Sequence, residues 1–129
     1  MKSEFLTELI GKQITDDIFE HTEPLLYRSA ILKCTIKIPV GFRNDKASVP
    51  RIPIIYELYG NKAHHEGTLH DYLFRKDSDP VVTFMQANRV FLEAMKARGK
   101  SFFVRQSMFM GVCLGGYFSY HKKSVMDEI

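Results

Sequence analysis

The chain has 129 residues, of which 45% are apolar and 26% are charged, and its formal net charge is +3. This length and composition predict one globular domain, residues 1–129, whose core needs no metal or disulfide support. The net charge is small and no run of Lys and Arg exceeds two residues, so we expect no nucleic-acid partner.

The two cysteines and the apolar runs indicate in which cellular compartment the protein is expected. Cys34 and Cys113 lie in apolar context, which predicts buried free thiols in a reducing compartment, with one disulfide as the alternative. Acidic residues soon follow the amino terminus, so we expect no signal peptide. The longest apolar run, 108–118, is too short and too rich in glycine for a transmembrane segment.

The first part of the chain, residues 1–53, predicts strands and a loop. Residues 3–20 have an apolar spacing that fits a helix and short strands equally well. Residues 25–29 are strand-like, and residues 31–40 contain a stretch of clear alternation. Together they predict an antiparallel β-hairpin with one solvated face, ended by Pro39, which has no N–H to donate. The positions expected to share the other face are Cys34, Ile36 and Ile38.

Residues 41–53 form a loop that contains two prolines and charges of both signs. Prolines make such a loop stiff, and a stiff polar loop on a scaffold is a place where functional groups are positioned. Asp45 and Ser48 are the candidates. The alternative is a structural crossover in which these two side chains cap turns or the next helix.

The second part, residues 54–120, predicts helices. After one or two helical turns at 54–59, the expected helices cover about 62–75, 80–98 and 102–120. The overall prediction is therefore an α+β fold: an N-terminal antiparallel hairpin or small sheet, a stiff loop, and a bundle of about three helices.

The ends of the last two helices have specific signals. Asp79 and Pro80 predict the N-cap and first position of the helix that ends at Gly99. The final helix is apolar on most sides and is expected to be buried on more than one face, before a polar, frayed tail at 121–129.

The strongest candidate site combines two helices. His70 and Asp71 are adjacent in an apolar segment, and Asn88 falls at the centre of an apolar stripe on the next helix. A buried amide without a partner costs about 1–3 kcal/mol, so we predict a hydrogen bond between Asn88 and His70 across antiparallel helices. The alternatives are an Asn88 that binds a backbone carbonyl or a buried water, and an Asp71 that pairs with Arg75. The rest of the stripe is Val81, Phe84, Met85, Phe91, Leu92 and Met95.

Three segments, residues 38–51, 70–74 and 87–95, together resemble a phage and prophage family catalogued as domain of unknown function 1353. The first segment reads Ile-Pro-Val-Gly-Phe-Arg-Asn-Asp-Lys-Ala-Ser-Val-Pro-Arg, and the second reads His-Asp-Tyr-Leu-Phe. In that family the position of Asn88 is usually aspartate and that of Phe74 usually tyrosine. The resemblance implies a gene of the late, tail or lysis region of a phage, and no established activity.

The His-Asp helix facing a polar residue on a second helix also resembles the phospholipase A2 arrangement. That resemblance implies His70 as the base that activates water, Asn88 as the residue that orients the His70 ring, and Asp71 as a ligand of a calcium ion. Zinc is the alternative divalent ion. No glycine-rich calcium loop precedes His70, and an asparagine at 88 cannot stabilise an imidazolium as a carboxylate does.

Two hypotheses follow. In the first, His70, Asp71 and Asn88 form a hydrolase-like site for an acyl ester, active or degenerate, with the Asp45–Ser48 loop as one wall and Ser48 as an alternative nucleophile. In the second, the protein is a non-catalytic tail or virion component or a host-interacting binding protein, and the cluster locks two helices together. Its partners would be other virion proteins or further copies of itself. In both, it is made in the host cytoplasm.

Overall fold

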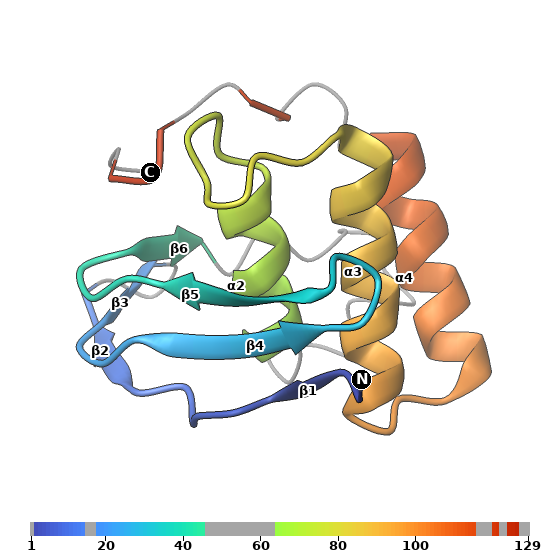
Figure 1. The fold of residues 1–129 in the computed structure, drawn as a ribbon, viewed down its shortest axis with the longest axis horizontal. Coiled ribbons are helices and arrows are strands. Elements are labelled where there is room, and N and C mark those ends of the chain that lie inside the picture. The colour runs from blue at the N-terminus through green and yellow to red at the C-terminus, as the bar shows by residue number, and fades with distance from the viewer. Residues whose placement is uncertain (1, 15–17, 46–63, 116–119, 122–123, 127–129) are drawn as a thin grey trace.

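The computed structural model describes residues 2–14, 18–45, 64–115, 120–121 and 124–126. Within them, strands come first and helices follow, which confirms the α+β class (Figure 1). The expected helical turns at 54–59 lie outside the described residues. The strands are β1 (Glu4–Phe5), β2 (Gly11–Gln13), β3 (Ile18–His21), β4 (Leu25–Ser29), β5 (Cys34–Ile38) and β6 (Arg43–Asp45), and the helices are α2 (His64–Leu73), α3 (Phe84–Ala97) and α4 (Phe102–Gly115).

The strands form two small antiparallel sheets, ordered β1-β4-β5 and β2-β3-β6. Of the two alternatives for residues 3–20, short strands are therefore the observed one. The expectation of an irregular loop from residue 41 was wrong at its start, because β6 pairs with β3. The Arg43 Nε donates to a Glu20 carboxylate oxygen across this pair at 2.8 Å, a charge-assisted contact that supports the strand.

The β4–β5 hairpin matches the predicted alternation. Leu25 pairs with Ile38 and Tyr27 with Ile36, and all four side chains are buried, whereas Thr35 and Lys37 are exposed. Glu93 of α3 holds the far end of the hairpin, because its carboxylate accepts hydrogen bonds from the Tyr27 hydroxyl at 2.7 Å, the Ser29 hydroxyl at 2.9 Å and the Ile31 backbone N–H at 2.9 Å. This contact, which no local pattern predicts, joins the sheet to α3.

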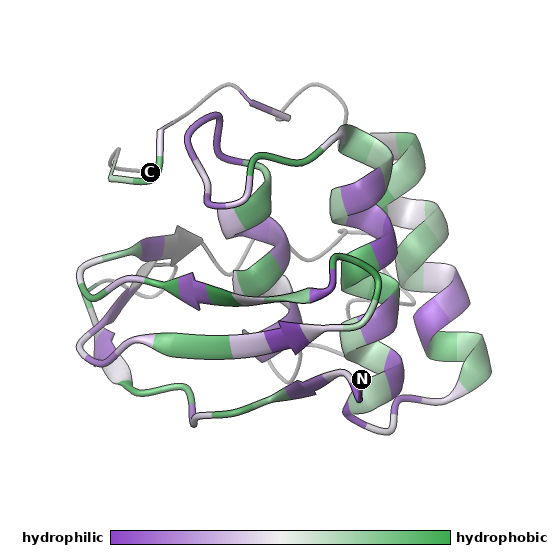
Figure 2. Ribbon diagram, in the orientation of Figure 1, coloured by the Kyte–Doolittle hydropathy of each residue, from purple (hydrophilic) through white to green (hydrophobic). Residues whose placement is uncertain are grey.

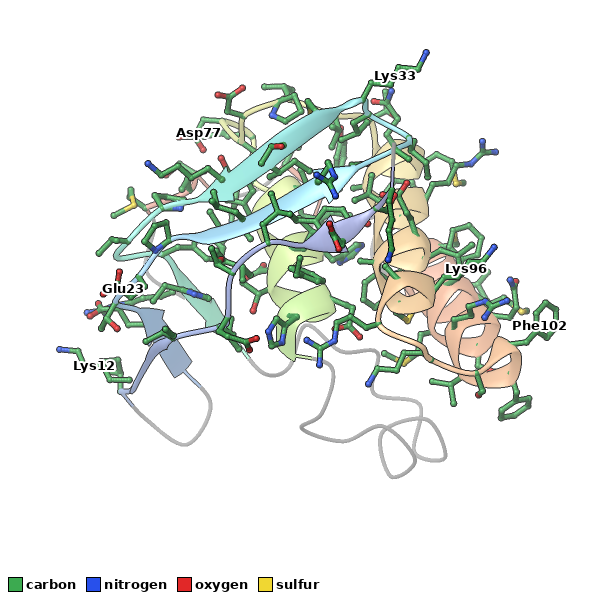
Figure 3. The ribbon with its side chains drawn as sticks, turned by 60° about the horizontal axis from the view of Figure 1, so that its bottom comes forward. Lys12, Glu23, Lys33, Asp77, Lys96 and Phe102 are labelled. Carbon is green, nitrogen blue, oxygen red and sulfur yellow. The ribbon has the colours of Figure 1, made fainter. Side chains whose placement is uncertain are left out.

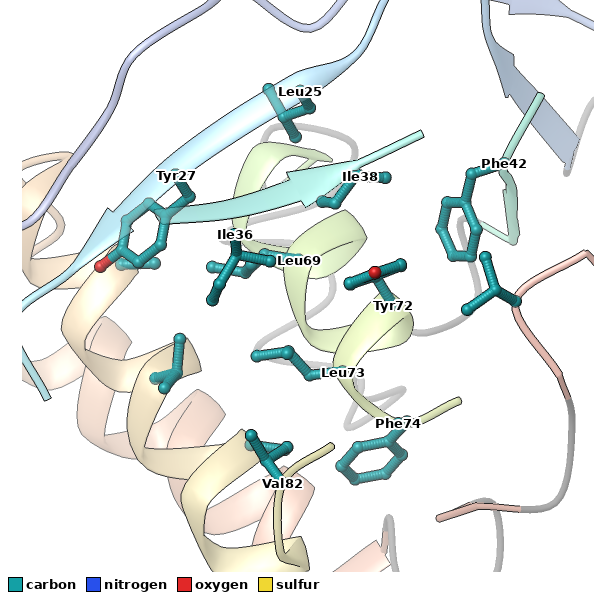
Figure 4. Packing of buried hydrophobic residues seen from close by; sticks show 14 residues of the cluster. Leu25, Tyr27, Ile36, Ile38, Phe42, Leu69, Tyr72, Leu73, Phe74 and Val82 are labelled. Atoms are coloured by element: carbon teal, nitrogen blue, oxygen red, sulfur yellow. The ribbon is translucent and has the colours of Figure 1, made fainter. Parts of the chain in front are cut away.

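The buried side chains form two clusters. The larger one lies between the β4–β5 hairpin and helices α2 and α3, where Leu69, Tyr72 and Leu73 of α2 face Ile36 and Ile38 (Figure 4). Their spacing of three and four residues puts the α2 side chains on one stripe, which explains why this segment is a helix packed on a sheet. The smaller cluster joins α3 to α4 through Phe91, Met95, Met108 and Val112.

Helix α3 begins four residues later than expected. The N-cap is Thr83, whose hydroxyl accepts from the Gln86 N–H at 3.1 Å while the Gln86 side chain accepts from the Thr83 N–H at 2.8 Å. This capping box, readable in the sequence as Thr-x-x-Gln, determines the start in place of Asp79 and Pro80. The expected buried stripe was wrong at two positions, since Val81 and Met85 are exposed. The buried face of α3 comprises Ala87, Asn88, Val90, Phe91, Ala94 and Met95.

Helix α4 was expected to be buried on more than one face, and this was wrong. It packs against α3 along one face, although most of its residues are apolar (Figure 2). Phe102, Phe103, Met110 and Leu114 are exposed. Burial of the opposite side would need another element, and none of the described residues supplies one.

The tail was expected to be frayed from residue 121, and this was wrong for its described part. Val125 is buried, and its N–H donates to the Asp77 carboxylate at 2.6 Å. The His121 N–H donates to the Phe74 carbonyl oxygen at 2.7 Å, and the Tyr120 ring packs edge-on against Phe74. These contacts attach the tail to the connection between α2 and α3.

Candidate functional site

His70 lies on α2 between the two buried clusters. Its ring packs 4.1 Å from the Phe74 ring and 4.9 Å from the Phe91 ring, measured between centroids. Phe74 belongs to the larger cluster, between the hairpin and the helices, and Phe91 belongs to the smaller cluster, which joins α3 to α4. Only 4% of the His70 surface is exposed, so the imidazole is a component of the core.

Asn88 on α3 faces this ring across antiparallel helices (Figure 1). The distance from His70 Nε2 to Asn88 Oδ1 is 2.7 Å, and Asn88 is fully buried. The predicted hydrogen bond is therefore present. Because the amide oxygen accepts, Nε2 carries the proton, and the ring is held as one neutral tautomer.

Cys113 of α4 is the third member of the cluster. The Asn88 amide nitrogen donates to its Sγ at 3.7 Å, so the one amide links α2 and α4 through α3. Both cysteines are free thiols, as expected, but they are half-buried rather than buried. Burial raises the pKa of Cys113, only partly opposed by the Asn88 hydrogen bond, so this residue is a thiol rather than a reactive thiolate. The sequence did not reveal this member, because the pattern of a helix that is apolar on most sides does not show which side faces α3.

The environment of His70 opposes a positive charge. Burial lowers the pKa of the imidazole to about 4, and the hydrogen bond to Asn88 offsets only part of that effect. The ring is therefore neutral at physiological pH. A general base works best with a pKa near the working pH, and this ring lies well below it.

Asp71 is adjacent in sequence but faces a different group. Its carboxylate Oδ2 lies 3.2 Å from Nη2 of Arg75, which follows the end of α2 by two residues, so the pair that we gave as an alternative is present. Arg75 is itself buried, lies over the Phe42 ring, and donates to the Ser124 carbonyl oxygen at 3.3 Å. A buried guanidinium needs this carboxylate, because a charge left unpaired in the interior is strongly destabilising.

The family model for proteins of unknown function DUF1353 matches residues 19–112 of this chain. The chain belongs to the DUF1353 family. The match includes His70, Asp71 and Asn88 and ends just before Cys113. No curated protein and no solved structure matches the chain.

The metal-ligand role is a poor fit for Asp71 in this DUF1353 member. The carboxylate neutralises Arg75, and no group of three or more His, Cys, Asp and Glu side chains within the described ranges is arranged to hold an ion.

The structure describes the two loop candidates, Asp45 and Ser48, only in part. Asp45 ends β6 and pairs in register with Ile18, and β6 contacts α2. The Asp45 side chain and all of Ser48 lie outside what the structure describes, so their part in the site stays a prediction.

A cavity of about 390 Å³ lies away from His70, between β1 and the ends of α2 and α3. Its lining includes Glu8, His65 and Arg98, and the closest His65 and Glu8 side-chain atoms are 3.9 Å apart. Behind it, the fully buried Glu66 pairs with Arg98 at 3.0 Å. His65 is half-buried near the start of α2, with its ring edge-on to Phe5.

Proposed function

We propose that this DUF1353 protein is a phage- or prophage-encoded binding protein, carried in the tail or virion or directed at a host factor. In this proposal the His70–Asn88 pair is a structural clasp between helices and performs no catalysis. The observation that supports it best is the burial of His70 between Phe74 and Phe91, with 4% of its surface exposed. A catalytic imidazole must reach a substrate cleft, and a ring enclosed by core side chains is suited to packing.

The engagement of Asp71 supports the same proposal. In a hydrolase-like site, this carboxylate would be available to an ion or to substrate. Here it lies 3.2 Å from the buried Arg75, which places it in the packing between α2 and the tail. The neutral state of His70 and the thiol state of Cys113 both fit a cluster whose role is to pack the helices together.

Hydrolysis of an acyl ester remains the second candidate. It is favoured by the 2.7 Å contact that fixes the imidazole tautomer, since a base needs a fixed orientation. Asn88 holds the ring but brings no negative charge, so a hydrolase built on this pair would be slow.

The test compares wild type, His70→Gln and Asn88→Asp in a screen of ester and phospholipid hydrolysis, with and without calcium or zinc. Thermal unfolding of the same three proteins is measured in parallel. We expect no turnover by any protein and a lower midpoint for His70→Gln. Turnover that is lost in a folded His70→Gln and increased in Asn88→Asp would establish the hydrolase instead.

A further inference from the structure

The outer face of α4 is apolar and uncovered within the part of the chain that the structure describes. Four large side chains on it are exposed: Phe102 by 68%, Phe103 by 61%, Met110 by 59% and Leu114 by 80%. Their spacing places them on the side opposite the residues that pack on α3. A soluble domain seldom exposes so many large apolar side chains together, and such a face marks a contact surface.

The same part of the chain is basic. Residues 94–126 contain six Lys or Arg and no Asp or Glu, whereas the net charge of all 129 residues is only +3. Three of these cations, Lys96, Lys100 and Arg105, lie within six residues of Phe102 in the sequence, and α4 begins at Phe102 with the two exposed phenylalanines. Figure 3 shows Lys96 and Phe102 on the same side of the molecule.

The cations and aromatic rings are arranged together. The Arg105 guanidinium lies 5.4 Å from the centre of the Phe102 ring, and its Nη1 donates to the Lys100 carbonyl oxygen at 3.1 Å. Arg98, in contrast, pairs with the buried carboxylate of Glu66, so it does not belong to this surface. We call this surface of α4 the ridge. Its exposed apolar side chains form the crest, and Lys96, Lys100 and Arg105 form the basic rim.

We propose that this ridge docks the protein on the surface of an anionic lipid bilayer. Phe102 and Phe103 enter the boundary between headgroups and acyl chains, and the basic rim pairs with lipid phosphates. The inference rests on the proposed binding role and names its partner. Helix α4 has 14 residues, about 21 Å in length, and therefore lies along the surface. None of the helices in the described ranges is long and apolar enough to cross a membrane.

The shape and charge of the ridge favour a lipid surface over a peptide ligand or a second copy of the chain. A peptide ligand would need a groove, and the cavity described above lies on the β1 side, at Glu8 and His65, rather than along this ridge. A second copy of the chain would bring two basic rims together, and residues 94–126 offer no acidic side chain to receive them. An anionic bilayer supplies both the apolar layer and the negative charge.

The test measures sedimentation of the full chain with vesicles of equal parts phosphatidylcholine and phosphatidylglycerol, and with vesicles of phosphatidylcholine alone. We expect binding to the anionic vesicles only, weakened by salt. Phe102→Ser/Phe103→Ser should weaken it by about tenfold or more, and Lys96→Gln/Lys100→Gln by several-fold. The matched controls are Val40→Ser, an exposed apolar residue between β5 and β6, and Lys33→Gln/Lys37→Gln on the hairpin, and both should bind as wild type does.

Three results would overturn the proposal. Absence of binding to anionic vesicles excludes a lipid partner, and a change from dimer to monomer in the phenylalanine variant assigns the ridge to self-association. A fall of many degrees in the unfolding midpoint of that variant shows that the two rings are buried in the folded monomer. Ester hydrolysis dependent on His70 would instead refute the structural role proposed for the His70–Asn88 pair without changing vesicle binding, so the two failures are distinguishable.

Discussion

His70 of α2 donates a 2.7 Å hydrogen bond from Nε2 to Oδ1 of Asn88, the one buried amide side chain on the inner face of α3. The bond joins the two helices inside the core, and the other end of the amide contacts Cys113 of α4. A buried polar contact of this kind specifies how helices meet, because any other alignment leaves its members unpaired.

Breaking one side of this bond should destabilise the protein more than replacing both sides. Asn88→Leu leaves the Nε2–H of His70 buried without an acceptor, which costs about 1–3 kcal/mol of the free energy of unfolding. The double variant His70→Leu/Asn88→Leu has neither polar group. It should therefore regain part of the free energy of unfolding that Asn88→Leu alone loses. Denaturant unfolding of the single and double variants measures the coupling.

Arg89→Leu serves as the control, because this exposed residue on the same helix should change stability by no more than about 0.5 kcal/mol. Strictly additive effects of the His70 and Asn88 substitutions would mean that the two side chains do not interact in solution.

The stability of the protein should fall between about pH 6.5 and pH 4. The pKa of His70 is lowered from 6.5 to about 4 in the folded state, so across this range the unfolded chain binds a proton that the folded protein does not. The stabilisation by neutral His70 is complete above pH 6.5 and is lost as the pH falls to about 4, and it amounts to about 3 kcal/mol. Unfolding midpoints in urea across this range measure it.

His70→Gln removes the titrating group and should flatten that part of the profile. An unchanged slope in this variant would assign the pH dependence to other groups.

Sequence reasoning recovered the elements whose pattern repeats regularly. The hairpin followed from alternation at Cys34, Ile36 and Ile38, and the His70–Asn88 bond followed from one polar residue on an apolar stripe. The wrong start of α3 came from giving weight to Asp79 and Pro80 when Thr83 and Gln86 formed the capping box.

Other features depended on tertiary contacts that no local pattern encodes. The β6–β3 pairing joins residues far apart in sequence, and the Glu93 contacts with the hairpin span more than sixty positions. A helix that is apolar on most sides, such as α4, does not show from its pattern which side is buried, so neither the place of Cys113 nor the exposure of Leu114 could be read from it. The site was therefore predictable as a pair and not as a cluster.

Asn88→Asp should raise the pKa of His70. A carboxylate at 2.7 Å from Nε2 favours the protonated ring, whereas the neutral amide adds little against burial. We expect the increase to be at least one pH unit, measured by NMR of the ring nitrogens. An unchanged pKa would show that the side chain at 88 does not contact the imidazole in solution.

Glu93→Gln should loosen the end of the β4–β5 hairpin. The carboxylate accepts from Tyr27, Ser29 and the Ile31 N–H, and an amide cannot accept at both of its ends. We expect a loss of about 1–3 kcal/mol and faster amide exchange at residues 30–33. Glu23→Gln, an exposed carboxylate outside these contacts, is the matched control, and equal effects of the two changes would contradict the role of Glu93.

The most direct test of the account is the titration of His70 in the wild-type protein, followed through its ring nitrogens by NMR. A clasp enclosed in the core predicts a pKa near 4 and the Nε2–H tautomer above it. A pKa at or above the ordinary value of 6.5 would mean that the ring reaches solvent or a negative charge, and would contradict the assignment of His70 to the core.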